Sequence, residues 1–492
     1  MLLSSQRRPF RVRMHFPDFL DASASPEDDI VYGHKFTWTP LHPSPTDITH
    51  LRYSYDELAT TALDRLDEIS PPKSKGWRCP GAEQGPGHRD LYELLEKHAA
   101  EDPILEKLWA EIITVPEWVD WAQIERGQRL LYTYSGQVML GLLFKSLIGG
   151  MAARRVVETL SRTGGFGVNV CRRRLLETLQ HFMAVNGSLK DIQPHGTGFV
   201  STVRVRLLHA SVRRRLMQLE HQRPGYYPTE ELGIPINDLH SIGTVSVYSS
   251  ATVYMSLPRL GVVLSDQEAE DYIALWRWVG HLLGTPVDWM ATAASAKATM
   301  ESVMKAELNP GENTHILVNN ILTAMSNVPP LYASREILAA QAYRLNGDHL
   351  ARSLGIEKPL WPWRLIVWFQ CLLLLCFSYS YAWLPEAMRN RRDERFRNLC
   401  NEMILNQKLG GIGTAARFEF QYLPGHGQMT ELGSLKGAVD AVQAVSKTGH
   451  GTVLSVLKIL AGGLLAFGIM RFGLRGAVHA VPTRVVGMLV SQ

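Results

Sequence analysis

The chain has 492 residues, 46% of them hydrophobic and 20% charged, so most of it can bury an apolar core. This length is enough for two or three domains, or for one large helical domain with extensions. The net charge of +4 is small for the size, and the arginine clusters lie within apolar helical patterns instead of alternating with aromatic residues. We therefore expect no nucleic-acid partner.

The number of cysteines and the composition of the first residues indicate the cellular compartment of the protein. Five cysteines are too few and too scattered for a disulfide framework or a Cys-x-x-Cys metal site. Residues 1–9 lack the apolar segment of a signal peptide. We expect an intracellular protein whose main domain faces a reducing compartment.

The composition changes along the chain. Residues 1–85 are rich in Pro, Ser, Asp and aromatics, and helical periodicity appears there only around Tyr55–Ile69, so we expect an N-terminal extension packed on the core. Apolar repeats of helical period dominate the next part and predict a helical domain over residues 86–355. Residues 245–254, rich in Val, Ser, Thr and Tyr, favour a strand by propensity.

Two helices within this domain carry candidate site residues. On the first, within residues 172–182, polar side chains share one face at spacings of three and four: Arg174, Glu177, Thr178 and His181. On the second, residues 203–217, an apolar stripe recurs at helical spacing: Val205, Leu208, Val212 and Leu216. His209 is expected on this stripe, with Arg206 three residues before it and Arg213 four after it.

These residue types suit one cofactor. A buried imidazole can ligate a metal, and guanidinium groups one turn away can bind acidic groups. A heme meets both demands, because its iron takes an axial histidine and its edge carries two propionates. Arg206 and Arg213 are then candidate propionate partners. The alternatives are a hydrogen-bonded core histidine and solvated arginines.

The end of the chain contains a hydrophobic helix with a basic flank, over residues 356–400. Leu365–Leu384 is 20 residues without a charge, long enough for a hydrocarbon core of ~30 Å. Tryptophans lie near its ends and arginines follow it, which favours a membrane helix with a cytosolic flank. A buried helix or a helix lying in the membrane surface are the alternatives. Residues 401–492 form a C-terminal region with a second, weaker apolar segment, Val453–Met470.

Several motifs occur together in a fixed order. They are Val115-Pro-Glu-Trp-Val-Asp120 with Gly127 behind it, Arg172-Arg-Arg-Leu-Leu-Glu-Thr-Leu-Gln-His-Phe182, the His-Ala-x-Val-Arg helix, Pro235-Ile-Asn-Asp-Leu-His-Ser-Ile-Gly-Thr244 and Trp276-Arg-Trp-Val-Gly-His-Leu-Leu-Gly-Thr-Pro286. Over about residues 110–290 this set resembles the family of latex-clearing rubber oxygenases and ER-bound oxygenases of the MpaB type. The resemblance implies an all-α fold with a globin-like core around a heme b. It also implies a helix over residues 245–254, and we follow it there.

The resemblance also implies roles for single residues. His209 matches the proximal iron ligand, and Arg174 and Thr178 match a distal Arg-x-x-Lys-Thr motif. Glu177 stands where that motif has lysine, and a carboxylate there could pair with Arg174 or act as a base. Glu158 matches by spacing a glutamate proposed as general base, whose pKa burial would raise. Its alternative role is a salt bridge to a neighbouring arginine.

Together these features predict an all-α, heme b-dependent oxygenase with a C-terminal hydrophobic helix, held on an intracellular membrane, the endoplasmic reticulum. Its partners would be O2, the membrane and a lipophilic, isoprenoid-containing small molecule of secondary metabolism, changed by C=C cleavage or allylic oxidation. Three alternatives stay open. They are another heme activity such as a peroxidase or oxidase, a non-catalytic heme-binding or membrane interaction protein, and a cofactor-free helical protein.

Overall fold

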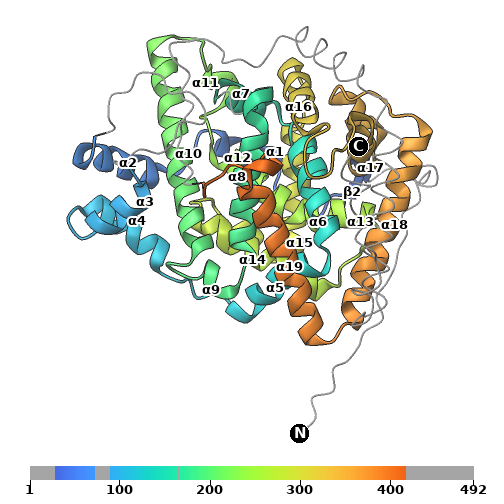
Figure 1. The fold of residues 1–492 in the computed structure, drawn as a ribbon. Coiled ribbons are helices and arrows are strands. Elements are labelled where there is room, and N and C mark those ends of the chain that lie inside the picture. Colours follow the sequence, from blue (N-terminus) through green and yellow to red (C-terminus); the bar gives the residue numbers. More distant parts are fainter. Residues whose placement is uncertain (1–27, 72–88, 164–165, 417–492) are drawn as a thin grey trace. The chain divides into compact units, whose positions relative to one another are not determined.

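The computed structural model describes residues 28–71, 89–163 and 166–416, which are mainly helical (Figure 1). The second apolar segment, Val453–Met470, lies outside these residues. One two-stranded antiparallel sheet is present in the described part, β1 (Asp28–Val31) and β2 (His34–Thr37), with Asp28 opposite Thr37. Tyr32 and Gly33 both have positive φ, as a two-residue hairpin turn of type I′ requires.

The helices follow in chain order. The first half contains α1 (Pro45–Thr49), η1 (His50–Arg52), α2 (Glu57–Ile69), α3 (Leu91–His98), α4 (Pro103–Ile113), α5 (Trp121–Thr133), α6 (Ser135–Leu140), the π-helix η2 (Gly141–Gly149), α7 (Arg154–Thr163), α8 (Val168–Val185), α9 (Leu189–Ile192), α10 (Thr197–Gln222) and α11 (Thr229–Leu232). The second half contains α12 (Asp238–Tyr248), the π-helix η3 (Thr252–Ser256), α13 (Leu257–Arg259), α14 (Asp266–Leu282), η4 (Asp288–Met290), α15 (Ala293–Glu307), α16 (Glu312–Met325), α17 (Arg335–Ser353), α18 (Trp361–Trp383), α19 (Glu386–Leu405) and η5 (Gln407–Leu409). The all-α prediction is confirmed.

Gly127 and its neighbours on α5 and α14 have a packing role. A Cβ on Gly127 would lie 2.3 Å from the backbone oxygen of Asp271, so α5 and α14 approach as closely as their backbones allow. Arg126 on α5 joins the two helices at the same level through two hydrogen bonds of 2.8 and 2.9 Å to the Asp271 carboxylate on α14. Trp278 on α14 is fully buried, and its indole N–H donates to the carbonyl of Ile192. These residues therefore anchor the core.

The N-terminal extension packs on the helical core. Its helix α2 begins at Glu57, with Asp56 as N-cap, and lies against α10 and α4. The hairpin is fixed to α15 by Glu301, whose carboxylate accepts from His34 (2.9 Å) and His42 (3.1 Å). The helix expected near residues 55–69 corresponds to α2, whereas the hairpin, α1 and η1 were not expected from helical periodicity.

Helix α18 lies against the domain with one face only. Val367, Cys371 and Leu375 are buried against α17 and α6, and the Ser378 hydroxyl donates to the Gln137 side chain at 3.1 Å. The opposite face leaves large apolar side chains exposed: Trp361, Leu365, Trp368, Phe369 and Trp383. Among the described helices, α18 alone is long and apolar enough to cross a membrane, by length and composition.

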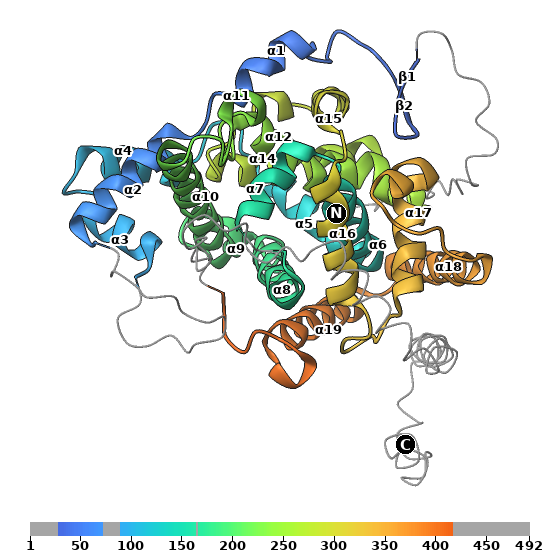
Figure 2. The same ribbon diagram turned by 90° about the horizontal axis from the view of Figure 1, so that it is seen from above.

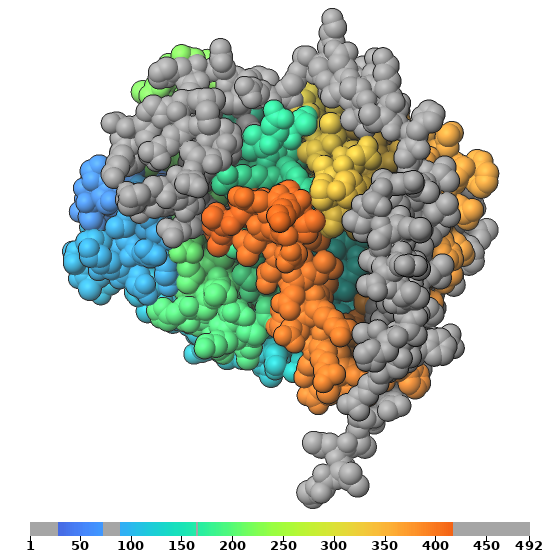
Figure 3. Space-filling model, in the orientation of Figure 1, coloured from blue at the N-terminus to red at the C-terminus, as the bar shows by residue number. Residues whose placement is uncertain are grey.

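Helix α19 returns from the end of α18 across the core. In the view from above it runs beside α8 (Figure 2), and in the space-filling view it crosses the middle of the visible face (Figure 3). Cys400 and Ile404 are its buried residues. Downstream of it, the backbone oxygens of Leu409 and Gly410 accept from Arg172 of α8. The basic helix is thereby tied to the helix that carries several predicted site residues.

Candidate active site

The two helices with the predicted site residues pack against each other. A Cβ on Gly198 of α10 would lie 2.6 Å from the backbone oxygen of Ala184 on α8, so the glycine permits this close approach. The Nδ1 of His181 lies 2.9 Å from the Ser201 hydroxyl and links the helices further along. Burial lowers the pKa of His181 to about 4, and His209 adds to this effect, so the two imidazoles are electrostatic neighbours.

His209 has the state that an iron ligand requires. Burial, and then the charge of Arg213, lower its pKa to about 4, so the imidazole is neutral at pH 7. The ring is half-buried, and no residue in the described part of the chain forms a hydrogen bond with either ring nitrogen. A lone pair on nitrogen is therefore available, and the axial position of a heme fits this residue.

The apolar stripe of α10 agrees with the sequence prediction at Val212 and Leu216, which are buried, and differs from it in the preceding turns. Val205 and Leu208 are only half-buried, whereas Leu207 and Ala210 are fully buried. The reason is that α10 has neighbours on several sides, including α2, α8 and α14, so its buried surface is wider than a single stripe.

Arg206 is buried but already neutralised. Its guanidinium bonds the Asp56 carboxylate at 2.7 and 3.0 Å and Glu111 at 2.8 Å. Only the Nη1 atom is buried without a partner. Two carboxylates of the chain thus occupy the place that propionates would take, and Arg206 does not fit a propionate partner.

Arg213 fits that role better. It donates to the carbonyls of Pro235 (3.2 Å) and Ile236 (2.8 Å) and to the Thr60 hydroxyl (2.9 Å), all of them neutral acceptors. None of the carboxylates in the described residues lies within ion-pair distance of it. It also borders a cavity of about 390 Å³ between α2 and the second half of α10. The cavity is lined by Tyr55, Thr60, Arg213, Arg214, Met217, Gln218, His221, Gln222 and Ile234.

The face of α8 brings Arg174 and Glu177 together. The Glu177 carboxylate accepts from Arg174 (3.1 Å) and also from Arg173 (3.0 Å), so the expected pairing with Arg174 is present. Thr178 is exposed, and its hydroxyl donates to the Arg174 carbonyl of its own helix. Glu177 thus belongs to an arginine cluster.

Glu158 lies on α7, a different helix from the other predicted site residues, and α7 packs against α16. Its carboxylate accepts from Arg162 one turn later and from the Asn313 amide at 2.9 Å. The structure therefore has the salt bridge that was the alternative to a catalytic base.

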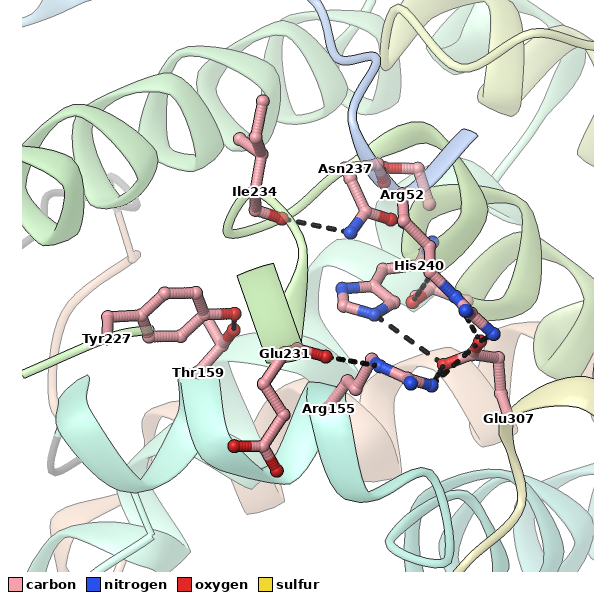
Figure 4. A network of polar contacts seen from close by, with 11 residues as sticks. Arg52, Arg155, Thr159, Tyr227, Glu231, Ile234, Asn237, His240 and Glu307 are labelled. Carbon is pink, nitrogen blue, oxygen red and sulfur yellow. Dashed lines mark hydrogen bonds and ion pairs between the residues drawn. The ribbon is translucent and has the colours of Figure 1, made fainter. Parts of the chain in front are cut away.

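A buried polar network that the sequence did not indicate surrounds Glu307 (Figure 4). Its carboxylate accepts from Arg52 (2.8 Å) and Arg155 (3.2 Å), and the His240 Nε2 lies 3.9 Å away. Burial first, then Arg155 and Arg52, lower the pKa of His240 to about 3. The network joins η1, α7, α12 and α15. Only the place of His240 in the 235–244 motif marks it in the sequence.

Comparison with known proteins gives the fold and the family. Residues 132–375 match the family model described as "ER-bound oxygenase mpaB/B'/Rubber oxygenase, catalytic domain". A rubber oxygenase of Streptomyces sp. (strain K30) is 27% identical over 291 residues, which cover 56% of this chain and 68% of that protein. Aurantioclavine synthase cnsA of Penicillium expansum is 42% identical over 81 residues, 16% of either protein.

The fold has a counterpart among solved structures. Latex clearing protein LCP in its closed state superposes with a TM-score of 0.50 at 20% identity, covering 74% of this chain and 95% of that one. This similarity concerns the fold, and the family model identifies the catalytic part. Residues 132–375 therefore form a catalytic domain of the ER-bound oxygenase mpaB/rubber oxygenase family, and the chain is an oxidoreductase.

Proposed function

We propose that the protein is a heme b-dependent oxygenase that uses O2 on a lipophilic, isoprenoid-containing small molecule. The observation that carries the proposal is His209, a neutral imidazole on the helix α10 with both ring nitrogens free of hydrogen bonds from the described residues. When bound, the heme supplies the activation of O2. The names of the two relatives, an oxygenase and a synthase, support an oxygenase of secondary metabolism.

The chain's own residues would share the remaining tasks. His209 would hold the iron, and Arg213 would stabilise a propionate, since no carboxylate among the described residues forms an ion pair with it. Arg174, Glu177 and Thr178 form the distal side, because their helix packs on α10. Glu158 is the proposed general base, which requires that its carboxylate leave Arg162 during turnover.

The heme is tested by replacing its ligand. We expect the wild-type protein, purified from heme-replete cells, to carry one non-covalent heme, and His209→Ala to lose most of it while keeping its helical circular dichroism. His349→Ala changes an exposed histidine on α17, away from the cavity that Arg213 borders, and should retain the heme. A colourless wild-type protein without iron, or full heme content in His209→Ala, would refute the proposal.

The chemistry is tested separately. Oxygen consumption with a prenylated substrate, and a product that contains oxygen from ¹⁸O2, are expected. Turnover of peroxide without O2 uptake would favour a peroxidase instead. A heme-loaded protein that consumes no oxygen with any prenylated compound would favour a non-catalytic heme-binding protein.

The membrane is the proposed source of the substrate. The exposed apolar face of α18, with tryptophans at both ends of the helix, would lie in an intracellular membrane, which we propose is the endoplasmic reticulum. A lipophilic substrate partitions into the bilayer and could reach the protein without crossing water. Because the other face of α18 is buried on the domain, attachment through one leaflet suits the helix better than a lipid-surrounded span.

A further inference from the structure

Lys145 is a buried lysine on the π-helix η2, away from the residues discussed above. It is 8% exposed and lies among the apolar residues of a second core region, between η2, α17 and η3. The packing there is tight, since a Cβ on Gly141 would lie 2.8 Å from the Ser256 Cβ of η3. Buried lysines are rare unless they are paired.

No anion compensates this lysine within the described residues. They provide neither a hydrogen bond nor an ion pair to its amine, and the charged group that acts on it is a cation, Arg259. Burial, and then Arg259, lower the pKa of Lys145 to about 7, so a large fraction of the amine is unprotonated at neutral pH. Desolvation and a neighbouring cation are the two influences that make a lysine nucleophilic.

An unused hydrogen-bond acceptor borders the same place. The Asn346 side chain on α17 donates through Nδ2 to the backbone oxygens of Phe144 (2.8 Å) and Ala342 (3.1 Å), but its Oδ1 is buried without a partner. The position of a Cβ on Gly149 would lie 2.4 Å from this Oδ1 and 3.6 Å from the Lys145 Cδ. The small space left by the glycine is therefore shared by the lysine side chain and the unsatisfied carbonyl.

We propose that Lys145 is a carbamylation site, whose neutral amine adds carbon dioxide to form a carbamate. The amine lone pair forms a bond to the carbon of CO2, one C=O π pair moves onto oxygen, and one N–H proton leaves to water. The product is an N-carboxylate of charge −1 and a released proton, so no oxidant or reductant is needed.

The surroundings suit this product. The carbamate places a negative charge beside Arg259, whereas the neutral amine offers it no charge and the protonated amine is repelled by it. The unsatisfied Oδ1 of Asn346 borders the same space, and the carbamate N–H would reach it after a shift of the lysine side chain, since no hydrogen bond joins the two residues in the structure. Carbon dioxide is small and apolar, so it can reach a site of this exposure through ordinary fluctuations of the core. A bridging water would satisfy Asn346 but would leave the protonated form of Lys145 beside the like charge of Arg259.

The experiment uses the full-length protein equilibrated with ¹³C-bicarbonate near pH 8. We expect one slowly exchanging carbamate signal in the ¹³C spectrum, lost in Lys145→Met. Lys305→Met should retain it, because Lys305 is a half-exposed lysine that already pairs with Asp29. Arg259→Leu should reduce the signal at least threefold, since the carbamate loses its counter-charge.

A second measurement needs no variant. Alkylation of the carbamate in wild-type protein with a trialkyloxonium salt, followed by peptide mass spectrometry, should place one extra esterified carboxyl group on Lys145. Modification confined to exposed lysines, or the absence of any trapped group at Lys145, would overturn the proposal. Neither measurement depends on heme, so its failure would leave the proposed function untouched, and failure of the heme test would leave this site untouched.

Discussion

At the scale of single residues, replacing Arg206 tests whether this residue stabilises the fold or binds the cofactor. Arg206→Met leaves Asp56 and Glu111 without their counter-charge, and Arg206 itself is only 2% exposed. We expect the free energy of unfolding, measured with urea, to fall by about 3 kcal/mol, as when one partner of a buried pair is removed. Arg214→Met, at an arginine that is itself 25% exposed, should cost less than about 1 kcal/mol. Unchanged stability with lost heme would instead favour a propionate partner.

Glu177 is the main departure from the rubber-oxygenase motif, and its pairing with two arginines predicts the spin state of the heme iron. A carboxylate held by Arg173 and Arg174 leaves the distal position to water or O2, so the ferric heme should be mainly high-spin. Glu177→Lys introduces a nitrogen ligand and should shift the heme towards low spin, whereas Glu177→Gln should not. Electron paramagnetic resonance distinguishes high-spin from low-spin ferric heme in these proteins. A wild-type heme that is fully low-spin, with nitrogen ligands on both faces, would indicate that another residue such as His181 occupies the site.

The sequence predicted which residue types form the candidate site, but it did not predict which residues bond to them. The helix around His209 could be predicted because apolar spacing within one helix is local information. The partners of Arg206 come from residues 150 and 95 positions away, so no pattern within the helix could identify them. The same holds for Glu307, which collects arginines from η1 and α7.

Among the elements, residues 245–254 show where propensity misleads. Their Val, Ser and Thr content favours a strand, yet the segment is the end of α12 and the start of η3. The hydroxyls make the helix possible in the interior, since Ser249 and Thr252 donate to carbonyls four residues earlier, at 2.7 and 2.8 Å. The family resemblance predicted this helix correctly. The hairpin at 28–37 was missed because its turn is Tyr-Gly, a weaker signal than Asn-Gly.

The element most open to test is α18, whose outer face is apolar and whose inner face is buried. Trp361→Glu combined with Trp368→Glu places two charges on the exposed side without touching the packed residues. Binding to vesicles of phosphatidylcholine and phosphatidylserine should weaken at least tenfold, which corresponds to about 1.4 kcal/mol. Leu331→Glu, at an exposed apolar residue elsewhere, should have no such effect. Full recovery of the wild-type protein in the soluble fraction after cell lysis would favour a protein partner for this face.

For the molecule as a whole, three histidines with lowered pKa values contribute to how stability responds to acid. In the folded protein the pKa values of His181 and His209 are about 4 and that of His240 is about 3, against an ordinary 6.5. Between pH 6.5 and 4 the unfolded chain therefore binds more protons than the folded one. The stabilisation from their neutral forms is fully present above pH 6.5 and is lost as the pH falls through this window.

We therefore expect the free energy of unfolding to decrease near pH 5 by about 1.4 kcal/mol per pH unit for each such histidine. His240→Leu removes one of the three, so urea unfolding at a series of pH values should show a slope near pH 5 that is smaller by about 1.4 kcal/mol per pH unit than in the wild type. The variant also removes the imidazole beside Glu307. That loss changes the free energy of unfolding at pH 7, but it does not by itself change how this free energy varies with pH. An unchanged slope in His240→Leu would mean that this histidine is accessible to protons in the folded state, and the Glu307 network would then be open to water.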